Sequence, residues 1–183
     1  MPEFEPITGR YFTMEVDGKP CRIYVEEAGS GIPLVCLHTA GSDARQYRHL
    51  LCDKTITDHY RVIAFDLPWH GKSNPPPGFR EDEYKLTTDL YKETVMAFCA
   101  AYELVDPVVM GCSMGGRVVL HLALGQADYF KAVIALEGSD KLDAYYDLDW
   151  LHRPDVHGGE IASAFVSAQV APQSPDEYRW ETL

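Results

Sequence analysis

Residues 108–120 read VVMGCSMGGRVVL and join two different local patterns. The stretch opens with an apolar run too short for a helix, passes through the pattern G-x-S-x-G at residues 111–115, and ends in an apolar run that suits a helix. Gly111 and Gly115 carry no side chains, so a strand and a helix can approach each other closely around the serine between them. The stretch therefore predicts a strand, a tight turn with Ser113 at its apex, and a helix.

Ser113 is the candidate nucleophile of the chain. A turn between a strand and a helix lifts the serine hydroxyl above the sheet and places the N–H of Met114 at a helix N-terminus, where a negative charge is stabilised. Cys112 lies just before the apex, a position that indicates a side chain directed into the fold. Because G-x-S-x-G also arises by chance in a chain with 14 glycines, the interpretation depends on two further motifs.

These motifs follow two more predicted strands. Residues 32–37 (IPLVCL) indicate a buried strand that ends in His38-Thr39-Ala40-Gly41. Residues 61–66 (RVIAFD) indicate another strand, which runs into D-x-x-x-H-G-x-S at residues 66–73. With these three motifs in this order, residues 11–140 resemble the α/β-hydrolase superfamily, in which the serine turn is the nucleophile elbow.

The resemblance implies roles for residues of these turns. Ala40 would donate the second N–H of an oxyanion hole, with Met114 donating the other. Thr39 stands where the family usually has glycine, so the chain departs from the family pattern in the backbone of this turn. We expect His38 to brace its loop, and the family implies that His70 is structural rather than the catalytic base.

Strand and helix signals alternate along the rest of this region. The Asp-Gly pair at residues 17–18 predicts a hairpin of strands over 11–16 and 21–27. Helices are predicted over 43–52, 84–103 and 114–125, the last with Gly125 as its C-cap, and a buried strand over 132–136. The predicted class is α/β: an α/β-hydrolase fold whose mostly parallel sheet begins with an antiparallel hairpin and carries helices on both faces.

The composition changes after residue 138. We expect residues 1–140 to form the N-terminal part of the hydrolase core and residues 141–183 to form part of a helical cap, with helices over 158–170 and after Ser174. In the family, such an insertion after the sixth strand covers the active site. Thr39 and Cys112 of the core, with Tyr145 and Trp150 of the cap, are the candidate lining of an acyl pocket. Packing between cap and core is an equally good reason for the two aromatic residues.

The position of the catalytic base is the open question of the sequence. All seven histidines lie before the serine turn, in the helix after it or in the cap segment, whereas the family places its base after a C-terminal strand. Glu137 and Asp140 follow the strand over 132–136 and are candidate acids. We expect the C-terminal strands, an acid and a histidine about 3 Å from Ser113 to come from a complementing C-terminal polypeptide of roughly 90–100 residues.

Composition narrows the class of protein. The chain has 183 residues, 46% of them hydrophobic, and a net charge of −12 spread along its length, which argues against nucleic acid or an anionic membrane as a partner. The five cysteines are odd in number and unclustered, so we expect free thiols and a cytoplasmic protein. Neither a metal-ligand pattern nor a dinucleotide motif occurs, and we expect no metal and no cofactor. No segment has the pattern of a bilayer span or a signal peptide.

Two classes of function remain. The first is a serine hydrolase that acts on a small-molecule carboxylic ester, lactone or amide through an acyl-enzyme. C–C bond hydrolases and cofactor-free perhydrolases of the superfamily stay open within this class. The second is a non-catalytic ligand-binding protein on the same scaffold. The intact turn around Ser113 favours the enzyme.

Overall fold

The computed structural model describes residues 2–81, 85–141 and 172–174. The chain divides into two compact units, Met1–Asp140 and Lys141–Leu183. All helices and strands given below belong to the first unit. The helices predicted over 158–170 and after Ser174 lie outside the described residues.

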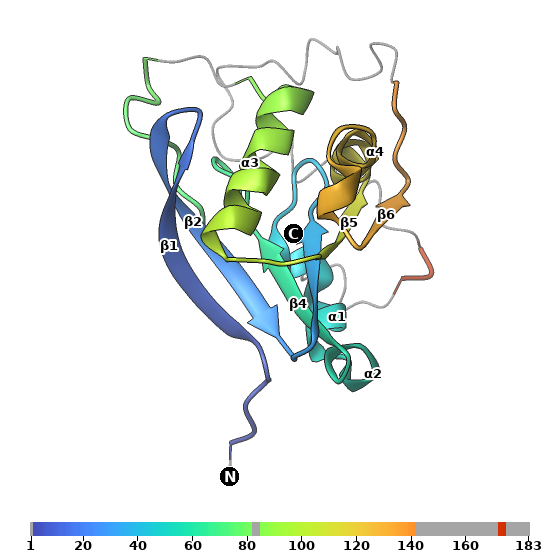
Figure 1. The fold of residues 1–183 in the computed structure, drawn as a ribbon. Helices are drawn as coiled ribbons and strands as arrows, with labels where there is room; N and C mark the ends of the chain where they lie inside the picture. Colours follow the sequence, from blue (N-terminus) through green and yellow to red (C-terminus); the bar gives the residue numbers. More distant parts are fainter. Residues whose placement is uncertain (1, 82–84, 142–171, 175–183) are drawn as a thin grey trace. The chain divides into compact units, whose positions relative to one another are not determined.

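Among the described residues, a six-stranded sheet forms the centre of the first unit (Figure 1). In chain order its strands are β1 (Thr8–Val16), β2 (Lys19–Ala28), β3 (Ile32–Leu37), β4 (Tyr60–Phe65), β5 (Val108–Cys112) and β6 (Ala132–Leu136). They lie side by side in the order β1-β2-β4-β3-β5-β6. β2 is antiparallel to β1 and to β4, whereas β4, β3, β5 and β6 pair in parallel. The predicted mostly parallel sheet with an antiparallel hairpin is confirmed.

The hairpin turn has the backbone conformation that Asp-Gly favours. Asp17 and Gly18 have φ angles of 50° and 67°. Two successive residues with positive φ are typical of the type I′ turn, whose twist matches that of the flanking strands.

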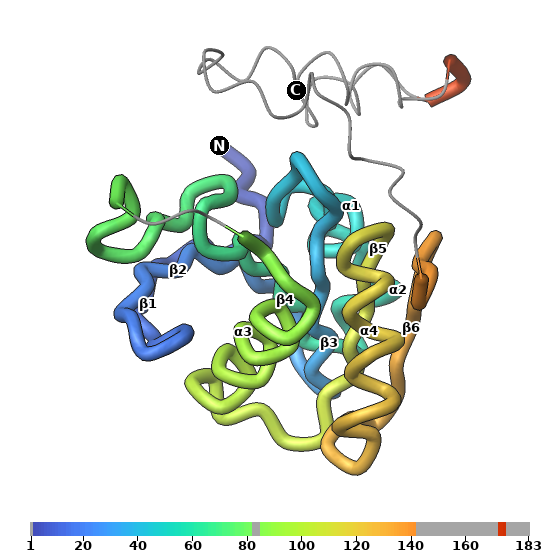
Figure 2. The backbone as a smooth tube through the Cα atoms, turned by 90° about the horizontal axis from the view of Figure 1, so that it is seen from above, coloured from blue at the N-terminus to red at the C-terminus, as the bar shows by residue number. Residues whose placement is uncertain are grey.

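Helices cover both faces of the sheet (Figure 2). On one face lie α3 (Thr88–Ala101) and α4 (Met114–Gly125). On the other lie the 3-10 helix η1 (Ala44–Tyr47) and the short helices α1 (Arg48–Cys52) and α2 (Lys54–Thr57). A further 3-10 helix, η2 (Ala127–Tyr129), precedes β6. The first unit therefore has the three-layer arrangement expected of an α/β fold.

Each central strand contributes to two cores. Val35 and Leu37 of β3 belong to the core under α3 and α4. Leu34 and Cys36, which alternate with them, belong to the core under η1 and α1. Because side chains of a strand alternate between faces, a strand covered on both sides must be apolar throughout, and this explains the unbroken apolar run of residues 32–37.

One predicted helix is divided in the structure. Residues 43–52, expected as a single helix, form η1 and α1, and α2 follows after Asp53. Asp43 accepts the N–H of Arg45 at 3.0 Å and starts η1. Asp53 has an extended backbone and accepts the N–H of Thr55 at 2.8 Å, so it begins α2 as an N-cap.

Two other helix boundaries are also corrected. The helix predicted over 84–103 begins at Thr88, because Thr87 acts as its N-cap and accepts the N–H of Leu90 at 3.1 Å. It ends at Ala101. Gly125, predicted as the C-cap of α4, is instead the last residue of that helix, and Gln126 is the C-cap.

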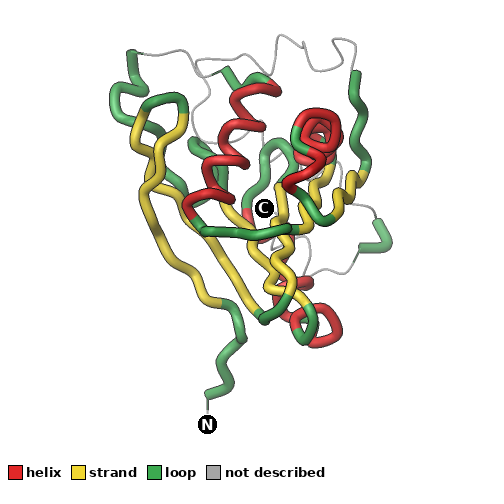
Figure 3. The backbone as a smooth tube through the Cα atoms, viewed as in Figure 1, coloured by secondary structure: helices red, strands yellow, loops and turns green. Residues whose placement is uncertain are grey.

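Residues 66–81 connect β4 toward α3 through turns and loops without helix or strand (Figure 3). This segment contains the second motif of the sequence and matters for the site described below.

Among the described helices, none combines the length and the apolar character that a bilayer crossing needs. None of the five cysteines is in a disulfide, and Cys21, Cys36 and Cys99 are buried.

Candidate functional site

Ser113 lies at the turn between β5 and α4. Its φ of 53° and ψ of −109° form a backbone conformation that residues with side chains rarely adopt. The turn is held on both sides, because the Ser113 N–H donates to Leu136 O at 2.8 Å and Ser113 O accepts the N–H of Arg117 at 2.8 Å. Strain of this kind persists only where the surrounding structure enforces it, and it is common at catalytic sites.

Glycines allow α4 to lie against the strands around this turn. A Cβ built at Gly111 would overlap the backbone of Gly115. A Cβ at Gly115 would overlap the carbonyl oxygen of Leu37 in β3 and lie 2.9 Å from its carbonyl carbon and its Cβ. A Cβ at Gly116 would lie 3.2 Å from the Cα of Gly138. The close approach predicted from the G-x-S-x-G pattern is therefore present, and it extends to β3 and to the end of β6.

Two backbone N–H groups near the turn have no hydrogen-bond acceptor among the described residues. They belong to Met114, the first residue of α4, and to Ala40, in the loop after β3. β3 and β5 are parallel neighbours with Leu37 opposite Gly111, so both loops leave the same end of adjacent strands. Ligands of open α/β sheets bind at this carboxyl end.

The loop after β3 achieves its shape without the glycine that the family usually has. Thr39 is not among the described residues with positive φ, whereas Gly41 has a φ of 70°. The Thr39 N–H donates to Gln46 Oε1 at 2.8 Å, and the Gln46 side chain also hydrogen-bonds with the Cys112 thiol. Gln46 thus connects the loop of one candidate donor with the strand end that precedes Ser113.

Sequence reasoning missed Gln46. Nothing in the local pattern distinguishes a bridging glutamine on a short 3-10 helix from a glutamine that faces solvent. Its role follows only from the parallel pairing of β3 and β5, which brings Thr39 and Cys112 within reach of one side chain. Since its amide both accepts and donates, a single residue can satisfy both partners.

His38 braces the loop after β3. It is 1% exposed, its Nε2 accepts the N–H of Leu67 at 3.2 Å, and its Nδ1 donates to Thr39 O at 2.8 Å. Burial lowers the pKa of His38 to about 4, so the ring is neutral at neutral pH, as these two bonds require. His70 Nδ1 lies 3.0 Å from Pro68 O, and burial lowers its pKa as well. Both contacts are those of structural histidines.

The two candidate acids differ in position. Glu137 follows β6 directly, has a φ of 50°, and places Oε2 4.0 Å from the Sγ of Cys112. Asp140 is exposed, three residues further along. Burial, together with the Glu137 carboxylate, raises the pKa of Cys112, so this thiol stays protonated beside Ser113.

The described part of the chain brings no histidine into hydrogen-bond contact with Ser113, whose hydroxyl bonds to none of the described side chains. Of the candidate pocket residues, Thr39 and Cys112 lie at this site, and Tyr145 and Trp150 lie outside the described residues. In the described ranges, no group of three His, Cys, Asp or Glu side chains could hold a metal ion.

A cavity of about 160 Å³ opens at a different place in the first unit. Its walls come from the β1–β2 turn at Asp17, the loop after β4 at Trp69, and α3 at Leu90. Neither Ser113 nor Ala40 lines it. The candidate site is therefore defined by the turn and its N–H groups and not by this cavity.

Part of the chain is similar in sequence to known hydrolases. Over 122 residues the chain is 24% identical to the pimeloyl-[acyl-carrier protein] methyl ester esterase of Vibrio cholerae, which covers 67% of this chain and 43% of that protein. Over 142 residues it is 28% identical to a 2-hydroxy-6-oxononadienedioate/2-hydroxy-6-oxononatrienedioate hydrolase of Escherichia coli, covering 75% of this chain and 47% of that protein. The chain spans less than half the length of these two relatives.

Solved structures share the fold. A hydrolase from Pseudomonas aeruginosa PA01 superposes with a TM-score of 0.76 at 18% identity, covering 94% of this chain and 65% of that one. The family model described as alpha/beta hydrolase fold matches residues 32–180, which include all three motifs and most of the sheet. The chain belongs to the alpha/beta hydrolase fold family.

Proposed function

We propose that this chain provides the nucleophile and the oxyanion hole of a serine hydrolase that acts on a carboxylic ester, lactone or amide. The observation that carries the proposal is the backbone of Ser113, held at a φ of 53° between β5 and α4. This geometry is typical of a nucleophile elbow. The unbonded N–H groups of Ala40 and Met114, and the esterase and hydrolase relatives, support it.

The proposed chemistry is acyl transfer in two stages. Ser113 Oγ attacks the substrate carbonyl carbon while its proton passes to a base, and the carbonyl electron pair moves onto the oxygen. The N–H groups of Ala40 and Met114 hydrogen-bond to this oxyanion. When the carbonyl re-forms, the leaving group departs with the proton from the base. Water repeats these steps on the acyl-enzyme, releases the carboxylic acid and restores Ser113.

We propose that the base and the acid come from a complementing C-terminal polypeptide that extends the sheet along β6. The support for this is the outer side of β6, the edge strand of the described sheet. On the two faces of this strand Val133, Ile134 and Leu136 are 36%, 40% and 43% exposed, and an edge strand with exposed apolar side chains is a site for further strand pairing. Glu137, at the end of the same strand, remains the candidate acid within this chain.

A fluorophosphonate probe on the natively purified protein tests the nucleophile. Mass spectrometry should locate the adduct on the peptide that contains Ser113, and the intact mass of the same sample shows whether a second polypeptide accompanies the chain. Ser113→Ala should abolish labelling and lower p-nitrophenyl ester turnover by several powers of ten while the melting curve is unchanged. Ester turnover retained by this variant would remove Ser113 from the nucleophile role.

A second variant tests the oxyanion hole. Met114→Pro removes one N–H at the first position of α4, where proline is compatible with a helix. We expect ester turnover to fall about 10²- to 10³-fold. Because proline also restricts the backbone of the preceding Ser113, a melting curve accompanies the assay and separates loss of the donor from loss of folding. An unchanged rate would exclude the Met114 donor.

A second candidate is the hydrolysis of a C–C bond next to a ketone. The match to the Escherichia coli hydrolase, whose name specifies a substrate with a 6-oxo group, favours this alternative. Assaying the native protein with p-nitrophenyl esters and with a 6-oxo dienoate compares the two. Absence of probe labelling at Ser113 would instead favour a non-catalytic ligand-binding protein.

A further inference from the structure

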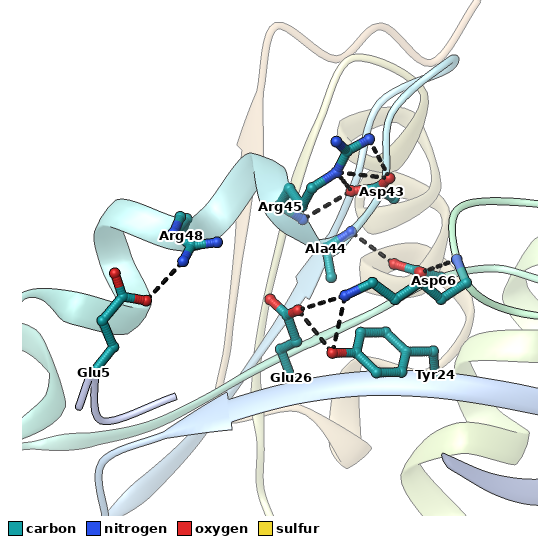
Figure 4. A network of polar contacts seen from close by, with 9 residues as sticks. Glu5, Tyr24, Glu26, Asp43, Ala44, Arg45, Arg48 and Asp66 are labelled. Carbon is teal, nitrogen blue, oxygen red and sulfur yellow. Dashed lines mark hydrogen bonds and ion pairs between the residues drawn. The ribbon is translucent and has the colours of Figure 1, made fainter. Parts of the chain in front are cut away.

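The loop that contains Ala40 is attached at both ends to the segment after β4. At its start, His38 Nε2 accepts the N–H of Leu67 at 3.2 Å. At its end, the Ala44 N–H donates to Asp66 Oδ1 at 2.7 Å (Figure 4). Residues 39–43 therefore lie between two attachment points, one to Leu67 and one to Asp66. Their position depends on both contacts.

The Asp66 carboxylate joins two loops through their backbones. Oδ1 accepts the N–H of Ala44, and Oδ2 accepts the N–H of Lys72 at 2.7 Å. Asp66 is 1% exposed, so water cannot take the place of either carboxylate oxygen as the acceptor of these N–H groups. Its own backbone is fixed to the sheet, because Ser73 Oγ donates to Asp66 O at 2.7 Å and accepts the N–H of Tyr24 at 2.8 Å. Asp66 is therefore anchored on one side and holds the loop on the other.

We propose that Asp66 is a positioning residue, whose ionised carboxylate holds residues 39–43 in the shape that directs the Ala40 N–H at the substrate oxygen and releases this loop on taking up a proton. A protonated carboxyl is itself a donor and cannot accept both N–H groups equally well. The inference rests on the proposed function for the role of Ala40. The coupling between the loops can be measured without a substrate.

The charges around Asp66 determine where this protonation occurs. Burial raises the pKa of Asp66 to about 6, with smaller contributions from the like charges of Asp43 and Glu26, while the two N–H bonds oppose the rise. Two cations pair with the carboxylates that neighbour Asp66. Arg45 Nη2 lies 2.9 Å from Asp43 Oδ2, and Lys72 Nζ lies 3.4 Å from Glu26 Oε1. Glu26 Oε1 also accepts the Tyr24 hydroxyl at 2.9 Å, whereas Glu26 Oε2 is buried without a hydrogen-bond partner among the described residues.

The direction of the effect follows from these contacts. The pKa of Asp66 in the folded protein lies above the value of about 3.9 for an unperturbed aspartate, so the folded protein takes up a proton as the pH falls through about 6. At neutral pH the carboxylate is ionised and the loop is held. In mild acid the carboxyl is neutral and one of the two N–H contacts weakens.

Amide resonances of the full chain test the coupling directly. The ¹⁵N-labelled protein is titrated from about pH 8 to about pH 4.5, across the expected midpoint. The Ala44 and Lys72 amides should shift together with one midpoint near 6, and the Ala40 amide should shift with the same midpoint. Glu26→Gln removes a like charge from beside Asp66 but keeps the Oε1 acceptor, so it should lower the common midpoint by roughly half a pH unit.

Steady-state kinetics test the consequence for catalysis. Asp66→Asn can accept from only one of the two N–H groups, and we expect kcat to fall about tenfold or more with KM little changed. The matched control is Asp89→Asn on the exposed first turn of α3, which should leave both constants unchanged. In mild acid the parent protein should lose part of its rate because the loop is released. Asp66→Asn should not show this part of the loss.

Two results would overturn the proposal. One is an Ala40 amide that does not titrate while Ala44 and Lys72 do. The other is a midpoint that Glu26→Gln leaves unchanged. If Asp66→Asn fails to fold, the Glu26→Gln titration decides the matter alone, because Glu26 bonds to Tyr24 and Lys72 and to none of residues 39–44. Failure of the probe to label Ser113 with the amide coupling intact would instead refute the proposed function.

Discussion

Replacing Gly115 with alanine should destabilise the protein, although alanine is the better helix former. In a helix without steric conflict this change gains about 1 kcal/mol. In α4, however, the new Cβ would overlap the carbonyl oxygen of Leu37 and lie 2.9 Å from its carbonyl carbon and its Cβ, whereas ordinary contacts begin at 3.4 Å. α4 and β3 must therefore separate by more than the 0.5 Å (3.4 − 2.9) that the two longer contacts alone require. Two of the three obstructing atoms, the carbonyl oxygen and carbon, are backbone and cannot rotate away. Overpacking costs about 1–3 kcal/mol, and the upper part of this range leaves a net loss of about 2 kcal/mol.

Urea unfolding followed by circular dichroism measures this loss. Gly125→Ala is the matched control in the same helix, since the nearest atom to its new Cβ is Lys92 Nζ at 4.0 Å. It should be neutral or stabilising by up to about 1 kcal/mol. A Gly115→Ala variant as stable as Gly125→Ala would refute the argument that close packing, and not helix propensity, determines this position. Gly115→Ala should also slow probe labelling of Ser113, because the elbow moves with α4.

Two further predictions concern buried groups. His38→Gln keeps an acceptor for the Leu67 N–H but cannot be protonated. Because the pKa of His38 is lowered to about 4 in the folded protein, the parent protein loses stability as the pH falls below about 6.5, the pKa of an unperturbed histidine. At about pH 4.5 the variant should lack about 2–3 kcal/mol of this loss. Urea unfolding at neutral and acid pH compares the two, and equal losses would contradict the role of His38. Maleimide should modify exposed Cys52 in the folded protein and spare Cys36 until denaturant is added, because Cys36 is buried and its pKa is raised. Peptide mapping checks the order, and early modification of Cys36 would count against the described core.

The sequence was sufficient for the elements whose geometry is encoded locally. The helix predicted over 114–125 and the strand predicted over 132–136 have those bounds in the structure, because the G-x-S-x-G turn and short apolar runs mark their ends. The Asp-Gly turn located the hairpin, but its strands, predicted over 11–16 and 21–27, extend over Thr8–Val16 and Lys19–Ala28. The division of residues 43–57 into three short helices was missed, because Asp53 can continue a helix or cap one, and its extended backbone decides which.

The contacts that shape the candidate site could not be predicted from the sequence. The motifs located Ser113 and the loop at Ala40, and they marked Thr39 as the departure from the family pattern. They did not indicate that Gln46 binds the Thr39 N–H or that Asp66 binds the Ala44 N–H. In each case a side chain bonds to a backbone group that comes close to it only after β3, β4 and β5 have paired. The local sequence pattern therefore does not indicate the contact.

The elbow is held together at positions where the absence of a side chain is itself the requirement. Gly111, Gly115, Gly116 and Gly138 form one layer between α4 and the strands, and any codon change there that adds a carbon atom pushes backbone against backbone. Evolution of this protein toward new substrates is therefore confined to surfaces outside that layer. If Ser113 is the nucleophile, as we propose, it can be inherited unchanged while the neighbouring loops diverge, so that the type of reaction and the choice of substrate can evolve separately.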